Sequence, residues 1–174
     1  MEKKTIWDLR RDTLEQFRAK AKAPVMMVLD NIRSLNNIGS IFRTADGFAV
    51  QGVMLCGITA CPPSAEIHKT ALGAENSVAW KYYPDTESCI AELRSDGWTI
   101  AVLEQVEGSV SLPLYRPGAG EKVAVVAGHE VDGVGQNIVD MADVCIEIPQ
   151  FGTKHSLNVA VSAALALYQL TQVK

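Results

Sequence analysis

Three polar, glycine-bearing segments contain the side chains of this sequence that could do chemistry. They are residues 30–43 (DNIRSLNNIGSIFR), residues 128–135 (GHEVDGVG) and residues 149–158 (PQFGTKHSLN). Each segment follows an apolar run that is typical of a buried strand. Ligands of an open parallel sheet bind beyond the carboxyl ends of its strands. Three such segments at one sheet edge therefore predict a single pocket.

The first segment combines an asparagine and an arginine near the start of a helix predicted over residues 38–49. Asn36 or Asn37 can serve as the N-cap of that helix. Arg43 lies off the apolar stripe, one turn into the helix, where its side chain can point back over the pocket. An asparagine, an arginine and a helix N-terminus together suit a phosphate or a ribose. The alternative is an N-cap beside a surface arginine.

The other two segments supply backbone groups, one carboxylate and the start of a helix. Glu130 stands where a dinucleotide fingerprint has its second glycine, and the sequence contains no Gly-Lys-Ser/Thr phosphate loop. The glycines beside Glu130 could also form only a tight turn. Ser156 follows His155, but the sequence has no Gly-x-Ser-x-Gly elbow, and adjacent residues rarely hold nucleophile–base geometry. Ser156 could instead be only a helix cap, so a serine hydrolase is disfavoured.

The elements that must position these segments alternate along the chain. Helical patterns over residues 38–49, 64–72, 86–95 and 157–170 separate runs that are apolar almost throughout. Such runs suit a sheet that is covered on both faces, and the alternation predicts an α/β fold with a mostly parallel sheet. Residues 105–121 are typical of an irregular loop. The predicted strands are residues 25–29, 53–56, 98–103, 123–127 and 144–148, with a possible sixth over 77–83.

The charge of the chain is unevenly distributed. The 174 residues carry a net charge of −4, which argues against a broad basic surface that coats nucleic acid. Residues 1–22 hold seven basic and four acidic side chains, whereas the remainder holds nine basic and sixteen acidic ones. We expect residues 4–20 to form a helix. Its basic side chains are either a solvated helix face or an arm that contacts phosphates.

Composition also bears on metals and location. None of the four cysteines forms a Cys-x-x-Cys pair, and the three histidines are not spaced with them as zinc ligands. We therefore expect no metal site, and buried free thiols in a reducing compartment. No signal peptide is visible, and no apolar run approaches the roughly 18 residues that suggest a membrane span. The expected location is the cytoplasm, without membrane association.

Taken together, the segments resemble the SpoU (TrmH-like) family of RNA ribose 2′-O-methyltransferases, in the SPOUT superfamily. The resemblance covers about residues 24–170. Residues 70–75 (TALGAE) also resemble a segment that many members carry. The three matching motifs, in family order, are residues 37–46 (NIGSIFRTAD), 128–133 (GHEVDG) and 148–159 (IPQFGTKHSLNV).

The resemblance implies a fold, a cofactor and an assembly. The fold would be a six-stranded, mostly parallel sheet with helices on both faces and a C-terminal trefoil knot. S-adenosylmethionine would be the cofactor, and the enzyme would act as a homodimer with its site at the subunit interface. Residues 1–22 would be a basic helical extension and residues 23–174 the methyltransferase domain. The almost wholly apolar residues 157–170 agree with a helix buried in such an interface.

The resemblance also assigns roles to individual residues. Arg43 would be the catalytic arginine, either as general base or as an electrostatic anchor for the phosphate and the developing alkoxide. The other expected catalytic residues are Asn37, Glu130, Ser156 and Asn158. The expected cofactor-binding residues are Gly128, Ile148 and Leu157. The expected RNA contacts are Arg10, Arg11 and Arg33.

Three functions are compatible with these residues. The favoured one is methylation of a ribose 2′-hydroxyl of tRNA or rRNA. A SPOUT enzyme that methylates a base nitrogen is disfavoured by the Ser-Leu-Asn segment together with Arg43. An RNA-binding module that has lost catalysis is disfavoured because every expected catalytic residue is present.

Overall fold

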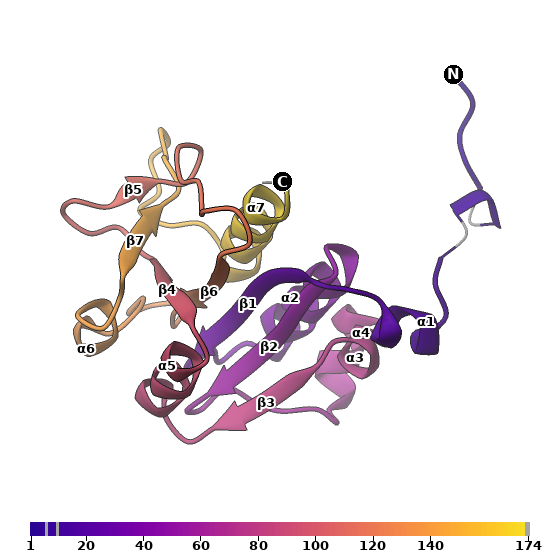
Figure 1. Ribbon diagram of the computed structural model, residues 1–174, viewed down its shortest axis with the longest axis horizontal. Coiled ribbons are helices and arrows are strands. Elements are labelled where there is room, and N and C mark those ends of the chain that lie inside the picture. The colour runs from indigo at the N-terminus through magenta and orange to yellow at the C-terminus, as the bar shows by residue number, and fades with distance from the viewer. Residues whose placement is uncertain (6, 10, 173–174) are drawn as a thin grey trace.

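The computed structural model describes residues 1–5, 7–9 and 11–172, and is built around one seven-stranded sheet (Figure 1). The strands lie in the order β3-β2-β1-β6-β4-β7-β5, and every neighbouring pair is parallel. The strands are β1 (Ala23–Asp30), β2 (Val50–Cys56), β3 (Trp80–Tyr83), β4 (Trp98–Leu103), β5 (Val110–Ser111), β6 (Lys122–Ala127) and β7 (Val144–Glu147). The helices are η1 (Trp7–Leu9), α1 (Leu14–Ala19), α2 (Leu35–Gly47), α3 (Ala65–Ala71), α4 (Ala74–Ser77), α5 (Thr86–Ser95), α6 (Gln136–Val139) and α7 (Val159–Thr171).

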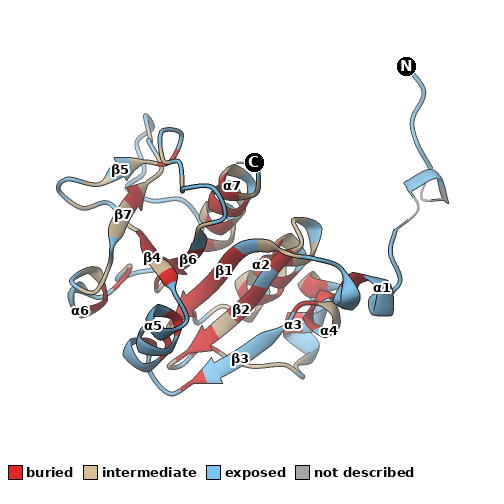
Figure 2. Cartoon of the chain, viewed as in Figure 1, coloured by how far each residue is buried: buried red, intermediate tan, exposed pale blue. Residues whose placement is uncertain are grey.

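Helices cover both faces of the sheet, which is why its central strands are apolar at successive positions. On one face, Phe42 of α2 and Leu167 of α7 are fully buried against β1 and β6. On the other face, Ile90 of α5 and Ile138 of α6 belong to a second buried cluster. Figure 2 shows the central strands buried and the edge strand β3 largely exposed. The predicted α/β class, with a parallel sheet and helices on both faces, is confirmed.

The predicted number of six strands is wrong. The seventh strand, β5, contains only Val110 and Ser111, which pair with Ile146 and Glu147 of β7. It lies inside the segment that the sequence predicts as an irregular loop. A strand of two residues is too short to show an alternation of apolar and polar side chains. Its pairing depends on main-chain hydrogen bonds to a strand more than thirty residues later. The sequence therefore carries no local signal for this strand.

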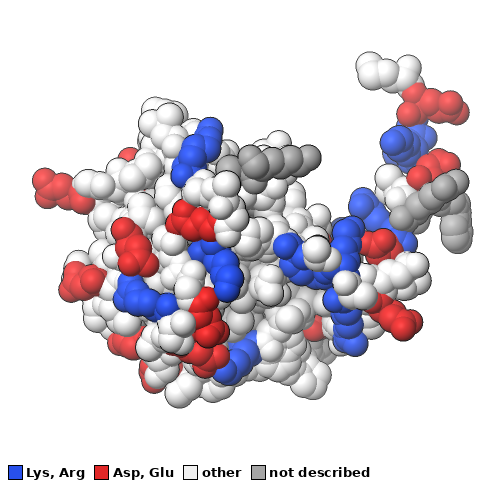
Figure 3. Space-filling model, viewed as in Figure 1, with Lys and Arg blue, Asp and Glu red and all other residues white. Residues whose placement is uncertain are grey.

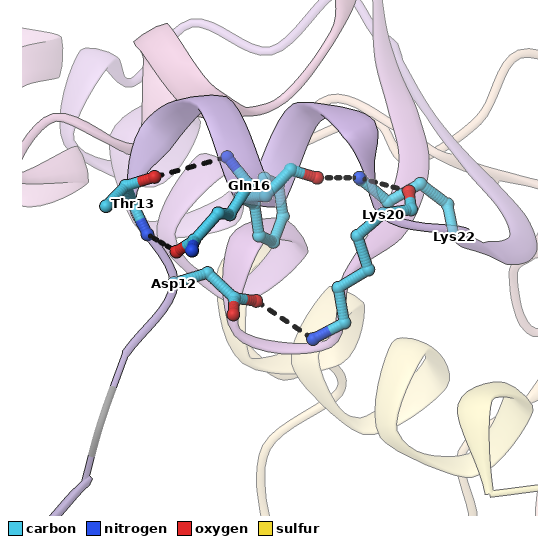
Figure 4. Close-up of polar contacts among 6 residues, drawn as sticks. Asp12, Thr13, Gln16, Lys20 and Lys22 are labelled. Atoms are coloured by element: carbon cyan, nitrogen blue, oxygen red, sulfur yellow. Dashed lines mark hydrogen bonds and ion pairs between the residues drawn. The ribbon is translucent and has the colours of Figure 1, made fainter.

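The N-terminal helix predicted over residues 4–20 is mostly wrong. Helix α1 begins only after Thr13, whose hydroxyl accepts from the Gln16 amide (3.2 Å) while the Gln16 side chain accepts from the Thr13 amide (2.9 Å) (Figure 4). This capping box is a start signal in the middle of the apolar pattern. Residues 6 and 10, on which part of the prediction falls, lie outside the described residues.

The basic side chains of the N-terminal segment lie on the surface. Figure 3 shows Lys and Arg side chains gathered over α1, with acidic ones among them. Lys20 pairs with Asp12 (3.0 Å), and Arg18 donates to the backbone carbonyl of Asn76 (2.6 Å), which ties α1 to α4. Only Phe17 of this helix is buried. Packing of α1 on the body thus rests on one aromatic side chain and a few polar contacts.

Helix α2, which carries the first motif, packs closely on α3 through Gly39. A Cβ atom at this position would overlap with the Thr70 hydroxyl and with the Ile67 backbone carbonyl. The missing side chain also lets Thr70 Oγ1 donate to the Asn36 carbonyl at 3.0 Å. Gly47, at the other end of α2, has open space around it.

We expect Gly39→Ala to destabilise the fold by about 1–3 kcal/mol, because backbone of α3 must move to admit the methyl group. Gly47→Ala on the same helix is the matched control, and should be neutral or stabilising by up to about 1 kcal/mol. The measurement is urea unfolding of both variants. Equal stability of the two would contradict the close α2–α3 packing.

Candidate functional site

A cavity of about 490 Å³ lies at the carboxyl ends of β4, β6 and β7. Small-molecule sites commonly have volumes of about 300–1,000 Å³. Its wall includes residues of two predicted polar segments, 128–134 from the segment after β6, and 150 and 155–158 from the segment after β7. Leu103, Ile146 and Leu157 supply apolar surface, while most of the remaining wall is polar or backbone. A pocket is therefore present at the predicted sheet edge, but no residue of the first predicted segment, residues 30–43, lines it.

A hydrogen-bonded network joins all three predicted segments beside this cavity. The Asn37 side-chain amide donates to Glu130 Oε1 at 3.1 Å. The Asn158 side-chain amide donates to Asn37 Oδ1, also at 3.1 Å. Residues that are 93 and 121 positions apart in the sequence are thus held together. We refer to Asn37, Glu130 and Asn158 as the Asn–Glu–Asn network.

Glu130 is also bound to the backbone that leads into α2. The Ser34 amide donates to Oε1 (2.9 Å) and the Arg33 amide donates to Oε2 (3.1 Å). Burial alone would raise the pKa of Glu130. The amides of Ser34, Arg33 and Glu130 itself, with the Asn37 side chain, outweigh burial and hold that pKa below its ordinary value of 4.5. Glu130 is therefore an ionised anchor at neutral pH.

Local helix capping leaves both asparagine side chains available to the network. Ser34, rather than Asn36 or Asn37, is the N-cap of α2, with its hydroxyl accepting from the Asn37 amide at 3.3 Å. The predicted N-cap is therefore wrong, and Asn37 sits inside the first helical turn. Asn158 caps α7 with its oxygen, which accepts from Ala160 and Val161 amides. Its NH₂ group is thereby directed to Asn37.

The second motif turns so tightly that backbone of the loop lines the cavity directly. A Cβ at Gly128 would overlap with backbone of Gly133 and Val134. Gly133 has a φ of +69°, a left-handed conformation that favours glycine. The Gly133 amide donates to the His129 carbonyl at 2.9 Å and closes the turn. The turn is thus more than a connection, because it brings backbone polar groups to the wall of the cavity.

The charge of the cavity wall restricts what can bind. Its lining includes four carboxylates, and no lysine or arginine is among the described residues that form it. An acidic wall repels phosphates and favours a ligand that carries positive charge. The four carboxylates belong to Glu104, Glu130, Asp132 and Glu147.

The structure brings together most of the predicted site residues. The predicted residues that line the cavity are Gly128, Glu130, Ile148, Ser156, Leu157 and Asn158. Asn37 joins them through the network. Arg43 is exposed, is not among the cavity-lining residues and forms no hydrogen bond or ion pair with another described residue. Six residues of helix place it about 120° around α2 from Asn37 and roughly 9 Å along the axis.

Two of the three predicted RNA-contacting arginines lie among the described residues. Arg33 is exposed beside the network and holds Glu130 through its backbone amide. Arg11 is exposed in the segment before α1. Arg10 lies outside the described residues.

Sequence reasoning missed the end of β4. Glu104 and Gln105 line the cavity together with the two predicted loops. A usable signal was present, since an acidic and an amide side chain follow an apolar strand directly. The same rule that selected the other three segments would have selected this one.

Two further observations concern metals and membranes. Within the described part of the chain, no group of three or more His, Cys, Asp or Glu side chains could hold a metal ion. All four cysteines are free; Cys56 and Cys89 are buried and the other two are half-buried. None of the helices that the structure describes is both long enough and apolar enough to cross a bilayer.

Comparison with known proteins finds a family model and curated relatives that match most of this chain. The model of the SpoU rRNA Methylase family matches residues 24–168. A curated relative is the 23S rRNA (guanosine-2′-O-)-methyltransferase RlmB of Neisseria meningitidis serogroup B. It is 31% identical over 157 residues, which cover 90% of this chain and 60% of the relative. This chain thus spans about 60% of the length of that relative.

Solved structures share the fold. The AdoMet-bound rRNA methyltransferase from Sinorhizobium meliloti superposes with a TM-score of 0.80 at 26% identity, over 90% of this chain and 59% of that one. The A. aeolicus TrmH/SpoU tRNA modifying enzyme superposes with a TM-score of 0.79 at 23% identity, over 91% of this chain and 81% of that one. The second likeness shows the fold alone.

We expect Glu130→Gln to lower the free energy of unfolding by about 1–2 kcal/mol at pH 7, because an ionised acceptor of backbone amides is replaced by a neutral one. The depressed pKa means that this stabilisation is present above pH 4.5 and is lost as the pH falls through the folded-state pKa. Urea unfolding from pH 7 to pH 3 should therefore show the two proteins converging below about pH 4.5. A difference that does not change with pH would contradict the anchoring role.

Proposed function

This chain belongs to the SpoU rRNA methylase family, and from that premise we propose that it transfers the methyl group of S-adenosylmethionine to a ribose 2′-hydroxyl of tRNA or rRNA. The observation that carries the proposal is the Asn–Glu–Asn network, which joins the three family motifs around one acidic cavity. A single motif could be a coincidence of turn and cap residues. Three motifs bonded to one another form a site.

The cavity fits S-adenosylmethionine in size and charge. The cofactor carries a sulfonium, an ammonium and one carboxylate group, and for its net positive charge a wall with four carboxylates is suitable. Its adenine can lie against apolar residues such as Ile148 and Leu157, while backbone at Gly128 can hydrogen-bond its polar edge. When bound, it supplies an activated methyl group. The expected cofactor residues Gly128, Ile148 and Leu157 thus keep the roles that the resemblance implies.

The residues of the network would orient the ribose rather than exchange its proton. Glu130 already accepts three hydrogen bonds from backbone and amide donors, which use most of the acceptor capacity of its carboxylate. Its proposed role is to hold Asn37 and the start of α2 against the cavity. Ser156 is exposed at the cavity rim, next to Asn158, and its hydroxyl can hydrogen-bond a ribose or phosphate oxygen. Alignment of the two reacting centres is the main contribution of such a site.

Arg43 would act as an electrostatic anchor. A guanidinium stays protonated in proteins, which disfavours a role as general base. A fixed positive charge can instead bind the RNA phosphate and stabilise the alkoxide that develops on the 2′-oxygen. Because Arg43 does not line the cavity of its own chain, it is proposed to complete the site of a second copy.

The apolar face of α7 supports the proposal of a homodimer. Val161, Leu165 and Tyr168 recur at helical spacing, and each is at least 42% exposed although the helix buries its opposite side in the core. A self-complementary contact through α7 would cover this stripe. Helix α7 packs on α2, with the Tyr168 ring 5.9 Å from that of Phe48. The same contact could therefore bring Arg43 on α2 toward the cavity of the partner.

The remaining features are proposed on the same premise. Residues 23–174 would form the methyltransferase domain, with residues 1–22 as an extension whose Arg11 contacts RNA together with Arg33. The segment after β7 returns to pack α7 on α2, β1 and β6, which is compatible with a trefoil knot threaded through a loop of the chain. A substrate RNA and S-adenosylmethionine imply action in the cytoplasm.

The direct test incubates the purified chain with S-adenosylmethionine that carries a trideuteriomethyl group and with total tRNA or rRNA from cells that lack this gene. Mass spectrometry of the digested nucleosides should find the label on a ribose. Label on a base would support the alternative SPOUT reaction, and RNA binding without transfer would support an inactive binding module.

Arg43→Ala should lower the turnover number by about 10²–10³-fold, while its affinity for the cofactor is unchanged. Loss of cofactor affinity in that variant would contradict the composite site.

The dimer is tested by a charge placed on the α7 stripe. We expect Leu165→Asp to sediment as a monomer and to lose methyl transfer, because a carboxylate cannot be buried unpaired in an apolar contact. Leu114→Asp, at a leucine that is 75% exposed in the loop after β5 and not on α7, is the matched control and should remain dimeric. A fully active monomeric Leu165→Asp variant would overturn the composite-site proposal.

A further inference from the structure

The end of β4 lies between the two loops that form most of the cavity. In the sheet, β4 is flanked by β6 on one side and β7 on the other. The loop that follows β6 carries Glu130, and the loop that follows β7 carries Ser156 and Asn158. Glu104 follows β4 directly, and its amide donates to the carbonyl of Ile146 in β7 at 3.1 Å. Its side chain is therefore in a position to reach the loop on the opposite side.

The Glu104 carboxylate binds the glycine turn of the second motif. Its Oε2 atom accepts from the Val134 amide at 3.0 Å, and its Oε1 atom accepts from the Gln105 amide at 2.8 Å. A Cβ atom at Gly133 would overlap with Oε2, so the carboxylate packs directly on this α-carbon. Both oxygens are thus occupied by backbone donors, and the second motif is held from the β4 side.

Gln105 makes the corresponding contact with the other loop. Its side-chain amide donates to the carbonyl of His155 at 2.8 Å. The next residue in the chain is Ser156, which lines the cavity. Two consecutive residues at the end of β4 therefore hold one loop each.

We propose that Glu104 is a positioning residue for the cofactor, with Gln105 in a supporting role. The second motif is fixed at Glu130 on the α2 side and at Glu104 on the β4 side, so that its backbone faces the cavity in one arrangement. Loss of the Glu104 bonds frees the Gly133–Val134 end of the turn while the Asn–Glu–Asn network remains. Cofactor affinity should fall, whereas RNA affinity should not, because Glu104 lies on the sheet side of the cavity. This inference rests on the proposed function.

The test compares Glu104→Gln with Glu107→Gln. Glutamine offers one carbonyl oxygen in place of two, so either Val134 or Gln105 loses its acceptor. Glu107 is an exposed carboxylate three residues further on and bonds no described residue of either loop. By calorimetry, Glu104→Gln should raise the Kd for S-adenosylmethionine about tenfold, a factor that corresponds to about 1.4 kcal/mol, and Glu107→Gln should leave it within about twofold. In turnover assays, Glu104→Gln should raise the KM for the cofactor with little change in kcat.

A second readout needs no cofactor. Amide hydrogen exchange at Val134 should be faster in Glu104→Gln than in the wild type, while the exchange of β1 amides is unchanged. Saturating cofactor should restore the slow exchange. If Glu104→Gln fails to fold, Gln105→Ala takes its place, because the Gln105 side chain is exposed. The Kd of Gln105→Ala for S-adenosylmethionine should be about threefold higher than that of the wild type.

These outcomes distinguish a failure of the proposed function from a failure of the positioning role of Glu104. A wild-type chain that does not bind S-adenosylmethionine contradicts the proposed function, and the exchange of Val134 still decides the positioning role. If the wild type binds S-adenosylmethionine and the Kd of Glu104→Gln, or of its replacement, is within twofold of the wild-type value, the inference is overturned while the proposed function stands. Equal weakening by Glu104→Gln and Glu107→Gln would also overturn it, since a general charge effect would then be sufficient.

Discussion

The Glu130 carboxylate forms the interactions on which the rest of this site depends. Parallel pairing brings the ends of β1, β6 and β7 to one edge of the sheet, but it does not fix how the segments beyond those ends meet. Glu130 does so by accepting from two backbone amides at the start of α2 and from Asn37, which in turn accepts from Asn158. Ionised hydrogen-bond acceptors of this kind are about twice as strong as neutral ones. One charge thus connects all three motifs, and the contacts of Glu104 and Gln105 hold two of them from the β4 side.

Around that network, the cavity is made largely of backbone and carboxylates. The backbone of Gly133 and Val134 can approach Gly128 closely only because Gly128 has no side chain. Gly133 has a positive φ, which glycine adopts most easily. Among the described residues, the wall carries four carboxylates and no lysine or arginine, with Glu104 on the β4 side and Glu130 on the α2 side. The net negative charge of the chain, which at first argues against nucleic acid, is thus in part a property of a site suited to a cationic cofactor. We propose that discrete groups such as Arg43 make the contacts with RNA.

The sequence predicts the parts that depend on hydrophobic pattern and misses those that depend on single polar bonds. The buried strands and α2 are predicted because both faces of the sheet are covered, and the three polar segments because they follow such strands. The N-cap of α2 is wrong because Ser34, Asn36 and Asn37 are all good caps, and only tertiary bonding decides between them. The long N-terminal helix is wrong because the capping box at Thr13 interrupts an apolar pattern. Glu104 is missed although it directly follows an apolar strand, and its bond to the Val134 amide, thirty residues away, is one that no local pattern predicts.

The central claim is that loops held by the Asn–Glu–Asn network form the binding site for S-adenosylmethionine. Its most direct test is an NMR titration of the ¹⁵N-labelled chain with this cofactor, with ATP as a phosphorylated adenosine of opposite charge. The account predicts that S-adenosylmethionine shifts the amide resonances of Gly128, Ile148 and Leu157 in a saturable manner, and that ATP at the same concentration does not. Equal shifts with ATP, or shifts confined to residues outside these loops, would contradict it.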